Sequence, residues 1–581
     1  MRIVIDKHVP VTMADGTMLS ADVYRPDVRA PLPTLVQRTP YDKDDAGAVL
    51  SAVDVVRTAE AGYAVVVQDT RGRYGSDGAF VPFAHEAADG AETVEWAAAQ
   101  PWSDGRVGMI GGSYVGATQW LAATRNPGPL QAIAPFITAA DYYEGWTYQG
   151  GAFQLGFCLE WALTSLGLGE LDRRVVRGDA DPAQLAAFVG LADRRAELFA
   201  RLPLTDVPEL TDLAPCYAEW LAHPTDDDYW RAVSPRAQHD RITAPALNVG
   251  GWYDIFAGGT IANYTGMRRS GGSRRARDLQ RLVIGPWSHS VKDGAFAERD
   301  YGLLAGIGGL DITGLHLRWF DHVLRGADNG AQHDRPVKLF VMGADVWRDE
   351  DDWPLPDTTW TDLYLHSGGR ANSAAGDGAL TTAAPGDEPA DVFLYDPRNP
   401  VPTRGGPTFL PGMDVAANAG PRDQRPVEAR HDVLCYTSAP LDRPLEVTGP
   451  VTLTVHVSSS AVDTDITGKL VDVHPDGRAE HLTDGILRAR YRDSRAEPAL
   501  LTPGRVFAAQ VDLGATANVF GAGHRIRLEV SSSNFPRFDR NSNCGGTIAG
   551  DGLADLVPAV NTVHHSRAHP SRLTLPVIDR R

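Results

Sequence analysis

The sequence predicts an α/β protein that carries an inserted helical segment and a second, all-β domain. Three features of the 581-residue chain indicate this organisation. Short apolar runs alternate with helical stretches over the first part, helical periodicity fills residues 146–239, and short alternating strands follow residue 356. Since a chain of this length is too long for one hydrophobic core, we expect several domains.

The first part of the chain predicts a parallel sheet. Residues 32–37 and 63–68 are short, rich in β-branched side chains and flanked by turn residues, as buried strands are. Residues 49–61 and 86–100 have helical periodicity, and residues 107–110 form another apolar run. Repeated strand–helix alternation predicts parallel strands with helices on both faces of the sheet.

Residues 146–239 predict a helical insertion. Helical stretches occupy residues 153–168, 182–201 and 217–223, and strand signals are missing there. Short apolar runs typical of strands occur again at residues 245–249 and 281–284, and residues 310–324 predict the last helix of this part of the chain. A helical segment inserted between strands of one sheet is expected to cap a site at the carboxyl ends of those strands.

The chain beyond residue 354 predicts a β domain. A low-complexity loop is expected at residues 368–388, and turn-spaced strands of this kind favour a β-sandwich or jelly roll. The expected strands are residues 391–395, 447–458, 469–473, 506–513, 525–531 and 572–577. The predicted domains are thus a discontinuous α/β domain at residues 1–145 and 240–354, a helical cap at 146–239, and a jelly-roll domain at 355–581.

Composition narrows the class of protein. A net charge of −19, from 55 basic and 74 acidic residues, argues against nucleic acid or an anionic membrane as partner. Four scattered cysteines without a CxxC pair predict no disulfide scaffold and no metal site. Charged residues near the N-terminus predict no signal peptide, and no apolar run reaches membrane-spanning length. We expect a cytoplasmic enzyme, with a homodimer left open.

Ser113 stands in a motif that suits a catalytic nucleophile. Residues 111–116 read Gly-Gly-Ser-Tyr-Val-Gly and directly follow the apolar run 107–110. A strand, a glycine-rich corner, a serine and then a helix place the serine on a sharp turn where neighbouring Cβ atoms would clash. The alternative is a small residue at a tight turn, because the pattern by itself is weak.

Asp254 and His289 complete a candidate triad with Ser113. Each of the three follows a predicted strand through glycine, and they occur in the chain order Ser, Asp, His that α/β-hydrolases use. Such a set supplies a nucleophile, a base and an acid that orients the base. The alternatives are that Asp254 caps a helix and that His289 is a structural histidine.

Two candidate donors could stabilise an oxyanion. The backbone N–H of Tyr114 follows the nucleophile, and Tyr41 lies in the loop after the strand at residues 32–37. A phenol stays protonated near neutral pH and can donate, although the residue pattern alone favours a packed aromatic. Arg71 follows another strand, and a structural role is the favoured interpretation, ahead of binding a substrate carboxylate.

Assembled, these segments resemble the CocE/NonD family of serine hydrolases over nearly the whole chain. The resemblance lies in residues 40–43, 68–72, 112–116, 251–254, 285–289, 347–350, 462–465 and 533–536. It implies an α/β-hydrolase core, a helical cap, a C-terminal jelly roll, the triad Ser113–His289–Asp254, and Tyr41 as an oxyanion donor. It also implies an aromatic acyl pocket, no metal and no organic cofactor. The pocket residues it implies are Trp146, Trp161, Phe256 and Phe409.

The predicted activity is hydrolysis of small-molecule esters with aromatic or bulky acyl groups. Residues 44–52 are rich in glycine and alanine and depart from the family pattern on the leaving-group side. Alternatives on the same scaffold are an α-amino-acid ester hydrolase or β-lactam acylase, and an X-Pro dipeptidyl peptidase. These activities require carboxylates that bind the free α-ammonium group of the substrate. Asp141, Glu144 and Glu160 are candidates, but no motif in the sequence marks them as such a site. A non-catalytic binding protein is the remaining alternative.

Overall fold

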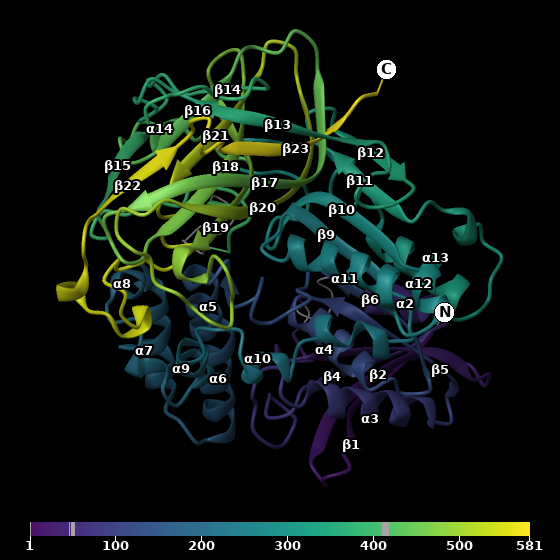
Figure 1. Cartoon of the computed structure of the whole chain (residues 1–581). Coiled ribbons are helices and arrows are strands. Elements are labelled where there is room, and N and C mark those ends of the chain that lie inside the picture. Colours follow the sequence, from purple (N-terminus) through teal and green to yellow (C-terminus); the bar gives the residue numbers. More distant parts are fainter. Residues whose placement is uncertain (1, 46, 48–52, 410–417, 581) are drawn as a thin grey trace.

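The computed structural model describes residues 2–45, 47, 53–409 and 418–580. Figure 1 shows a first sheet with its helices, a cluster of helices beside it, and a second, green-to-yellow β region above both. The predicted fold class, an α/β core with a helical insertion and a C-terminal β domain, is confirmed. Part of the predicted helix at residues 49–61 and part of the divergent segment 44–52 lie outside the described residues.

The first sheet is mixed. In the described part of the chain it holds ten strands in the order β1-β2-β4-β3-β5-β6-β9-β10-β11-β12. The strands from β4 to β11 pair in parallel, whereas β1–β2, β2–β4 and β11–β12 are antiparallel. The prediction of a parallel sheet was therefore wrong at both edges, because the short links after β1 and β11 permit only antiparallel neighbours. The strands are β1 (Ile3–Thr12), β2 (Met18–Pro26), β3 (Leu32–Thr39), β4 (Ala64–Asp69), β5 (Ser103–Gly112), β6 (Leu130–Phe136), β9 (Leu247–Tyr253), β10 (Arg281–Ser288), β11 (Val337–Val341) and β12 (Val346–Glu350).

Helices cover both faces of this sheet. Val36 and Val66 belong to a core with α3, α4, α11 and α12, whereas Leu35 and Val65 belong to a core with α2 and α13. Neighbouring strand residues thus point to opposite, equally dry faces, which explains the continuous apolar runs. The helices are α2 (Val55–Glu60), α3 (Glu86–Ala98), α4 (Tyr114–Thr124), α11 (Ala257–Ser270), α12 (Arg274–Asp278) and α13 (Ile312–Val323).

The helical insertion lies between β6 and β9. It contains a π-helix, η1 (Trp161–Gly167), inside the stretch predicted as one helix, and Leu168 N–H donates to Leu163 C=O across five residues. It also contains a two-stranded hairpin, β7 (Tyr148–Gln149) with β8 (Ala152–Phe153), which the sequence analysis missed. Its helices are α5 (Leu155–Glu160), α6 (Leu168–Arg177), α7 (Pro182–Asp193), α8 (Arg195–Ala200), α9 (Cys216–Ala222) and α10 (Asp228–Arg231).

The second sheet builds the C-terminal domain. Along β17 the buried residues Val451, Leu453, Val455 and Val457 alternate with more exposed ones, as expected of strands with one dry face. The residues 368–388 predicted as a loop contain β14, which local sequence does not reveal because it forms by pairing with β13 and β16. The strands are β13 (Thr358–His366), β14 (Ala379–Thr381), β15 (Asp391–Tyr395), β16 (Leu434–Ser438), β17 (Leu445–Ser459), β18 (Asp465–Val473), β19 (Ala479–Arg488), β20 (Phe507–Phe520), β21 (Arg525–Ser531), β22 (Ala559–His564) and β23 (Arg572–Ile578).

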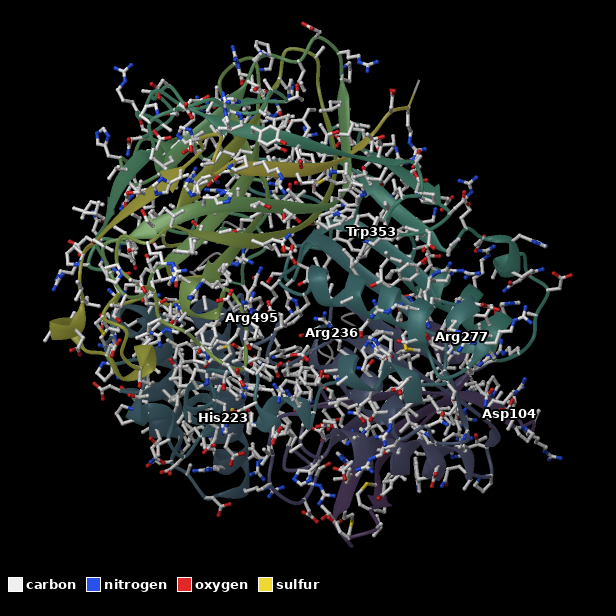
Figure 2. The ribbon with its side chains drawn as sticks, viewed as in Figure 1. Asp104, His223, Arg236, Arg277, Trp353 and Arg495 are labelled. Atoms are coloured by element: carbon white, nitrogen blue, oxygen red, sulfur yellow. The ribbon has the colours of Figure 1, made fainter. Side chains whose placement is uncertain are left out.

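The C-terminal domain contacts the rest of the molecule through shared apolar cores as well as polar side chains. The hydroxyl of Tyr253, the last residue of β9, donates to the carbonyl of His481 on β19 at 3.3 Å. Arg495, labelled in Figure 2 at the border between the second sheet and the helical insertion, donates to Glu144 at 3.4 Å. The β domain is therefore in contact with the loops that follow the first sheet. None of the helices in the described residues combines the length and apolarity needed to cross a bilayer.

Candidate active site

Three polar side chains meet at one edge of the first sheet. Ser113, Asp254 and His289 are each the first residue after a strand, namely β5, β9 and β10. β9 and β10 are parallel neighbours, with Gly251 opposite Gly285. Since parallel strands end at the same edge, the three residues converge although they lie up to 176 positions apart.

The three side chains form one hydrogen-bonded chain. His289 Nε2 lies 3.0 Å from Ser113 Oγ, and His289 Nδ1 lies 2.8 Å from Asp254 Oδ1. Asp254 is 1% exposed, so its interaction with the imidazole is shielded from water. It does not cap a helix, because α11 begins at Ala257 with Phe256 in the N-cap position. The arrangement can move the Ser113 proton to His289 and stabilise the resulting imidazolium.

The backbone at Ser113 is strained. Its φ of 60° and ψ of −126° are rare for a residue with a side chain, and they hold the hydroxyl at the start of α4. Gly111 has a φ of 126°, and a Cβ there would lie 2.2 Å from Val115 Cγ1. A Cβ on Gly116 would lie 2.8 Å from Thr138 Cβ. The flanking glycines are therefore required by the space around the turn.

Two hydrogen-bond donors, the Tyr114 N–H and the Tyr41 phenol, belong to residues next to Ser113. Tyr114 is the first residue of α4, where a backbone N–H has no partner within the helix and where the helix dipole favours negative charge. The Tyr41 phenol lies beside the Ser113 hydroxyl and the Trp161 indole. Burial raises the pKa of Tyr41 to about 12, against the opposing effect of those two side chains. The phenol therefore remains a donor throughout the neutral and mildly alkaline range.

Arg73 supports the loop that carries Tyr41. Its guanidinium is 2% exposed and donates to the carbonyls of Pro40 and Ser165, both at 2.9 Å. It thus ties the loop after β3 to η1 of the helical insertion. Arg73 was not among the predicted site residues, and its position after a buried strand is the one signal in the sequence that points to it. Arg71, by contrast, binds Asp89 with two hydrogen bonds of 2.6 and 2.9 Å, which agrees with the structural role favoured above.

Ser113 and His289 open onto a cavity of about 270 Å³. Trp161 and Phe409 line it, as predicted, and the Phe409 ring lies edge-on to the His289 imidazole at 5.3 Å between centroids. The other wall residues are mostly apolar and were not among the four pocket residues that the family resemblance implied. They are Gly112, Val115, Phe136, Ile137, Phe157, Ser165 and Lys292.

Trp146 and Phe256, also predicted to bind substrate, do not line this cavity. Their rings stack at 4.4 Å with an interplanar angle of 16°, and both side chains are fully buried. Trp146 packs edge-on against Trp161 at 5.4 Å, and Phe256 packs edge-on against His289 at 5.2 Å. The two residues therefore support the wall and the His289 imidazole from behind, a distinction that aromatic spacing in the sequence does not make.

The carboxylates considered for amine recognition are bound elsewhere. Asp141 Oδ1 accepts the backbone N–H groups of Tyr143 and Glu144 at 2.9 Å. Glu144 accepts from Gly150 N–H, and Glu160 Oε1 pairs with Arg195 at 2.7 Å. Burial raises the pKa of Glu160 to about 7, with Arg195 acting against it. None of the three residues lines the cavity at Ser113.

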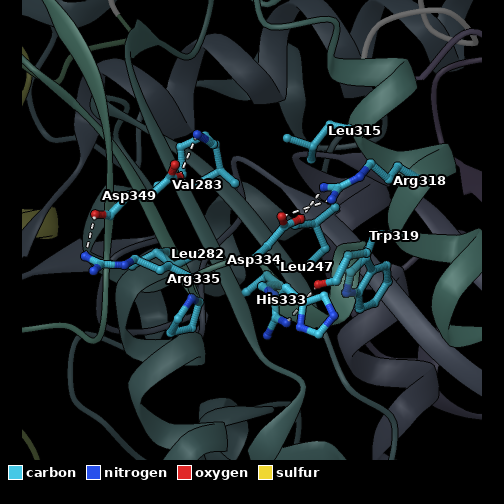
Figure 3. A pocket seen from close by; sticks show the side chains of 14 residues that line it. Leu247, Leu282, Val283, Leu315, Arg318, Trp319, His333, Asp334, Arg335 and Asp349 are labelled. Carbon is cyan, nitrogen blue, oxygen red and sulfur yellow. Dashed lines mark hydrogen bonds and ion pairs between the residues drawn. The ribbon is translucent and has the colours of Figure 1, made fainter. Parts of the chain in front are cut away.

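A larger cavity of about 400 Å³ lies where β9 and β10 begin, at the ends of these strands that are farthest from Asp254 and His289 (Figure 3). It is lined by the first residues of β9 and β10, Leu247 and Arg281, whereas the triad follows the last residues of these strands. It therefore contains none of the reacting groups.

One group among the described residues could hold a metal ion, namely Asp472, His474 and His524. It belongs to the second sheet and its turns, and the guanidinium of Arg478 lies 3.0 Å from His474 Nε2. This positive charge disfavours a cation there, and no residue of the group lines the cavity at Ser113.

Comparison with known proteins adds independent evidence. Residues 15–291 match the X-Pro dipeptidyl-peptidase (S15 family) model, and residues 329–574 match the model of the X-Pro dipeptidyl-peptidase C-terminal non-catalytic domain. The chain is 44% identical to the cocaine esterase of Rhodococcus sp. (strain MB1 Bresler) over 99% of both chains.

Solved structures share the fold over the full length. An α-amino acid ester hydrolase superposes with a TM-score of 0.79 at 25% identity, covering 99% of this chain and 96% of the other. A CocE/NonD family hydrolase from Staphylococcus aureus superposes with a TM-score of 0.71 at 19% identity, covering 100% and 94%. Because the chain is 44% identical over 99% of its length to the cocaine esterase, it belongs to the CocE/NonD family of serine hydrolases and is an enzyme that acts on esters.

Proposed function

We propose that the protein is a carboxylesterase in which Ser113, His289 and Asp254 act as a catalytic triad. Ser113 Oγ attacks the ester carbonyl while His289 Nε2, 3.0 Å away, takes the hydroxyl proton. Asp254 holds the imidazole through Nδ1 and stabilises its charged form. His289 then protonates the departing alcohol, which leaves an acyl group on Ser113.

In the second half of the reaction the same groups hydrolyse the acyl-enzyme, with water in place of the Ser113 hydroxyl as the attacking group. His289 takes a proton from water, the resulting hydroxide attacks the acyl-enzyme carbonyl, and the proton passes to Ser113 as the acid leaves. In both halves the Tyr41 O–H and the Tyr114 N–H stabilise the tetrahedral oxyanion. Because these donors are in position before the reaction, they need no reorganisation when the charge develops.

The observation that carries this proposal is the hydrogen-bonded chain from Ser113 through His289 to Asp254 at an aromatic cavity. An aryl organophosphonate tests it directly, since only an activated serine is phosphonylated. We expect mass spectrometry to find one label, on the peptide that contains Ser113. Labelling of another serine, or none at all, would contradict the triad and would revive the non-catalytic alternative.

Replacing Tyr41 with phenylalanine is expected to lower kcat by about 10²–10³-fold with little change in KM. The variant keeps the ring and removes one of the two oxyanion donors, whose contribution is felt in the transition state. Steady-state kinetics with an aryl ester measure the effect. Tyr74→Phe is the matched control, because Tyr74 is a nearby phenol that does not line the cavity. Turnover of Tyr41→Phe equal to wild type would remove Tyr41 from the mechanism.

The aromatic wall supports a preference for aromatic or bulky acyl groups. Trp161, Phe157 and Phe409 line the cavity together, so a flat acyl group would bury apolar area against their rings. We expect a panel of 4-nitrophenyl esters to show a higher kcat/KM for benzoyl than for acetyl, by about tenfold or more. A preference for acetyl would contradict the assignment of this cavity as the acyl pocket.

The amine-directed activities are less well supported. The α-amino acid ester hydrolase and X-Pro dipeptidyl-peptidase relatives raise them, but the cavity at Ser113 is lined by a lysine and by no carboxylate among the described residues. A free ammonium group would therefore find no counter-ion beside Ser113. Matched aryl esters with and without an α-amino group separate the two readings. A preference of several hundredfold for the aminated ester would overturn the plain esterase.

The domain boundaries and the compartment belong to the same proposal. The boundary after residue 354 lies between β12 and β13, which are in different sheets, and supports a jelly-roll domain at residues 355–581. Residues 146–239, between β6 and β9, are proposed as the cap over the catalytic domain at residues 1–145 and 240–354. The four cysteines are free, which supports a reducing compartment such as the cytoplasm.

A further inference from the structure

A lysine stands in the wall of the catalytic cavity. Lys292 follows His289 by three residues, in the loop after β10, and it lines the same cavity as Ser113. Its carbonyl accepts a hydrogen bond of 2.9 Å from Ile307 N–H, which anchors the backbone of this loop. Its ammonium lies 5.7 Å from the centre of the Phe136 ring, another wall residue. The mechanism proposed above assigns no step to Lys292.

Lys292 differs from every other lysine of the chain. The sequence contains five lysines, and the other four, Lys7, Lys43, Lys338 and Lys469, each form an ion pair with a carboxylate. In the described part of the chain, Lys292 has neither an ion pair nor a hydrogen bond to its ammonium, although the protein carries 74 acidic residues. The wall of the cavity therefore carries a positive charge that no carboxylate among the described residues pairs with.

The surroundings of Lys292 make an unpaired charge costly. Burial lowers the pKa of Lys292 from its ordinary value, and the negative charge of Asp254 opposes this effect. Asp254 itself is bound to His289 and cannot serve as a partner without leaving the triad. Desolvated charges need a partner of opposite sign, and their attraction to one is stronger in a dry site than in water. A ligand that brings an anion into the cavity would supply this partner.

We propose that Lys292 binds a carboxylate carried by the ester substrate, so that the preferred substrates are anionic esters. The inference rests on the esterase function proposed above and names a substrate class for it. Two kinds of ester offer this chemistry: monoesters of dicarboxylic acids, with the carboxylate on the acyl side, and esters of hydroxy acids, with the carboxylate on the alcohol side. The same charge disfavours esters that carry a protonated amine.

Two pairs of substrates test the proposal and distinguish the two sources. The acyl arm compares the 4-nitrophenyl monoester of terephthalic acid with 4-nitrophenyl 4-methylbenzoate. The alcohol arm compares 4-carboxyphenyl benzoate with 4-carbamoylphenyl benzoate. In each arm the ratio of kcat/KM for the anionic ester to that for the neutral ester is measured for wild type and for Lys292→Met. Dividing the two ratios cancels the intrinsic reactivity of the esters.

The selectivity ratio is expected to fall by about 10- to 100-fold in Lys292→Met in one of the two arms, as loss of a charge-assisted hydrogen bond predicts. Lys292→Arg should retain most of it, because the positive charge remains. Lys338→Met is the matched control: it removes one positive charge whose partner is Asp349, at 2.6 Å on the edge of the first sheet, and it should keep the wild-type ratio.

A selectivity ratio that is the same in wild type and Lys292→Met in both arms would overturn the proposal. That result is distinguishable from failure of the esterase function itself. If only the inference about Lys292 fails, the wild-type enzyme still hydrolyses the neutral esters and is still phosphonylated on Ser113. If the esterase function fails, neither the neutral nor the anionic esters are hydrolysed.

Discussion

Replacing Ser113 with alanine is expected to lower kcat by about 10⁶-fold on any ester substrate. In the proposed mechanism the Oγ atom of Ser113 becomes bonded to the acyl group, and no other nucleophile lies within hydrogen-bonding distance of His289 Nε2 among the described residues. What remains after its loss is attack by water in a cavity that still contains the oxyanion donors. Steady-state hydrolysis of an aryl benzoate, at enzyme concentrations high enough to see residual turnover, measures the effect.

The Ser113→Ala variant should fold normally, so that its loss of activity reports on chemistry. Alanine and serine both carry a Cβ, and the strained φ of 60° is therefore no worse in the variant. An unchanged midpoint of thermal unfolding checks this point. Ser290→Ala serves as the control, since Ser290 is an exposed serine next to His289 and should leave kcat at the wild-type value. Residual activity of Ser113→Ala above 1% of wild type would rule out Ser113 as the nucleophile.

Replacing Asp254 with asparagine is expected to lower kcat by about 10⁴-fold while the fold is retained. Asp254 Oδ1 accepts a hydrogen bond from the Nδ1–H of His289, at 2.8 Å, which leaves Nε2 free to accept the proton of Ser113. An asparagine amide would donate to Nδ1 instead, so that the imidazole would carry its proton on Nε2 and could no longer act as a base. The carboxylate charge that stabilises the imidazolium would also be lost.

The Asp254 effect is measured as kcat near neutral pH. Asp293→Asn is the matched control, because Asp293 is an exposed aspartate in the loop after His289 and, among the described residues, its side chain accepts one local hydrogen bond, from Ala295 N–H. It should keep wild-type turnover. A loss of less than tenfold in Asp254→Asn would show that His289 is oriented by something else, and the buried carboxylate would then have to be assigned a different role.

Much of the fold was predictable because its signals are local. The strand at residues 391–395 and that at 525–531 have the predicted bounds, and the segments before Ser113 and His289 are strands, as their apolar runs indicate. The missed or wrong elements depend on partners distant in sequence. β14 is three residues long and exists because it pairs with β13 and β16. The antiparallel edges of the first sheet likewise follow from the connections between strands rather than from their composition.

The wall of the candidate site likewise combines a feature that the local sequence predicts with features that depend on distant segments. Tryptophans and phenylalanines in residues 146–161 predict an aromatic region, but they do not predict which rings face the cavity. Residues Trp161–Gly167 form a π-helix, which directs their side chains differently from an α-helix. Trp161 and Ser165 line the cavity at Ser113. Trp146 instead stacks on Phe256 behind the wall. Phe409 reaches the cavity from a segment more than a hundred residues beyond His289, across the domain boundary.

The sequence by itself determined the candidate triad: a serine on a glycine-flanked turn, an aspartate and a histidine, each directly after a strand and in the order of an α/β-hydrolase. Parallel strands ending at one edge bring such residues together, so order and spacing suffice. Only the tertiary structure decided what surrounds them, including which aromatic rings form the wall, that Arg73 holds the Tyr41 loop, and that Lys292 has no counter-ion within the part of the chain that the structure describes. These depend on contacts between segments far apart in the chain, and a lysine in a sequence does not show whether a carboxylate lies beside it.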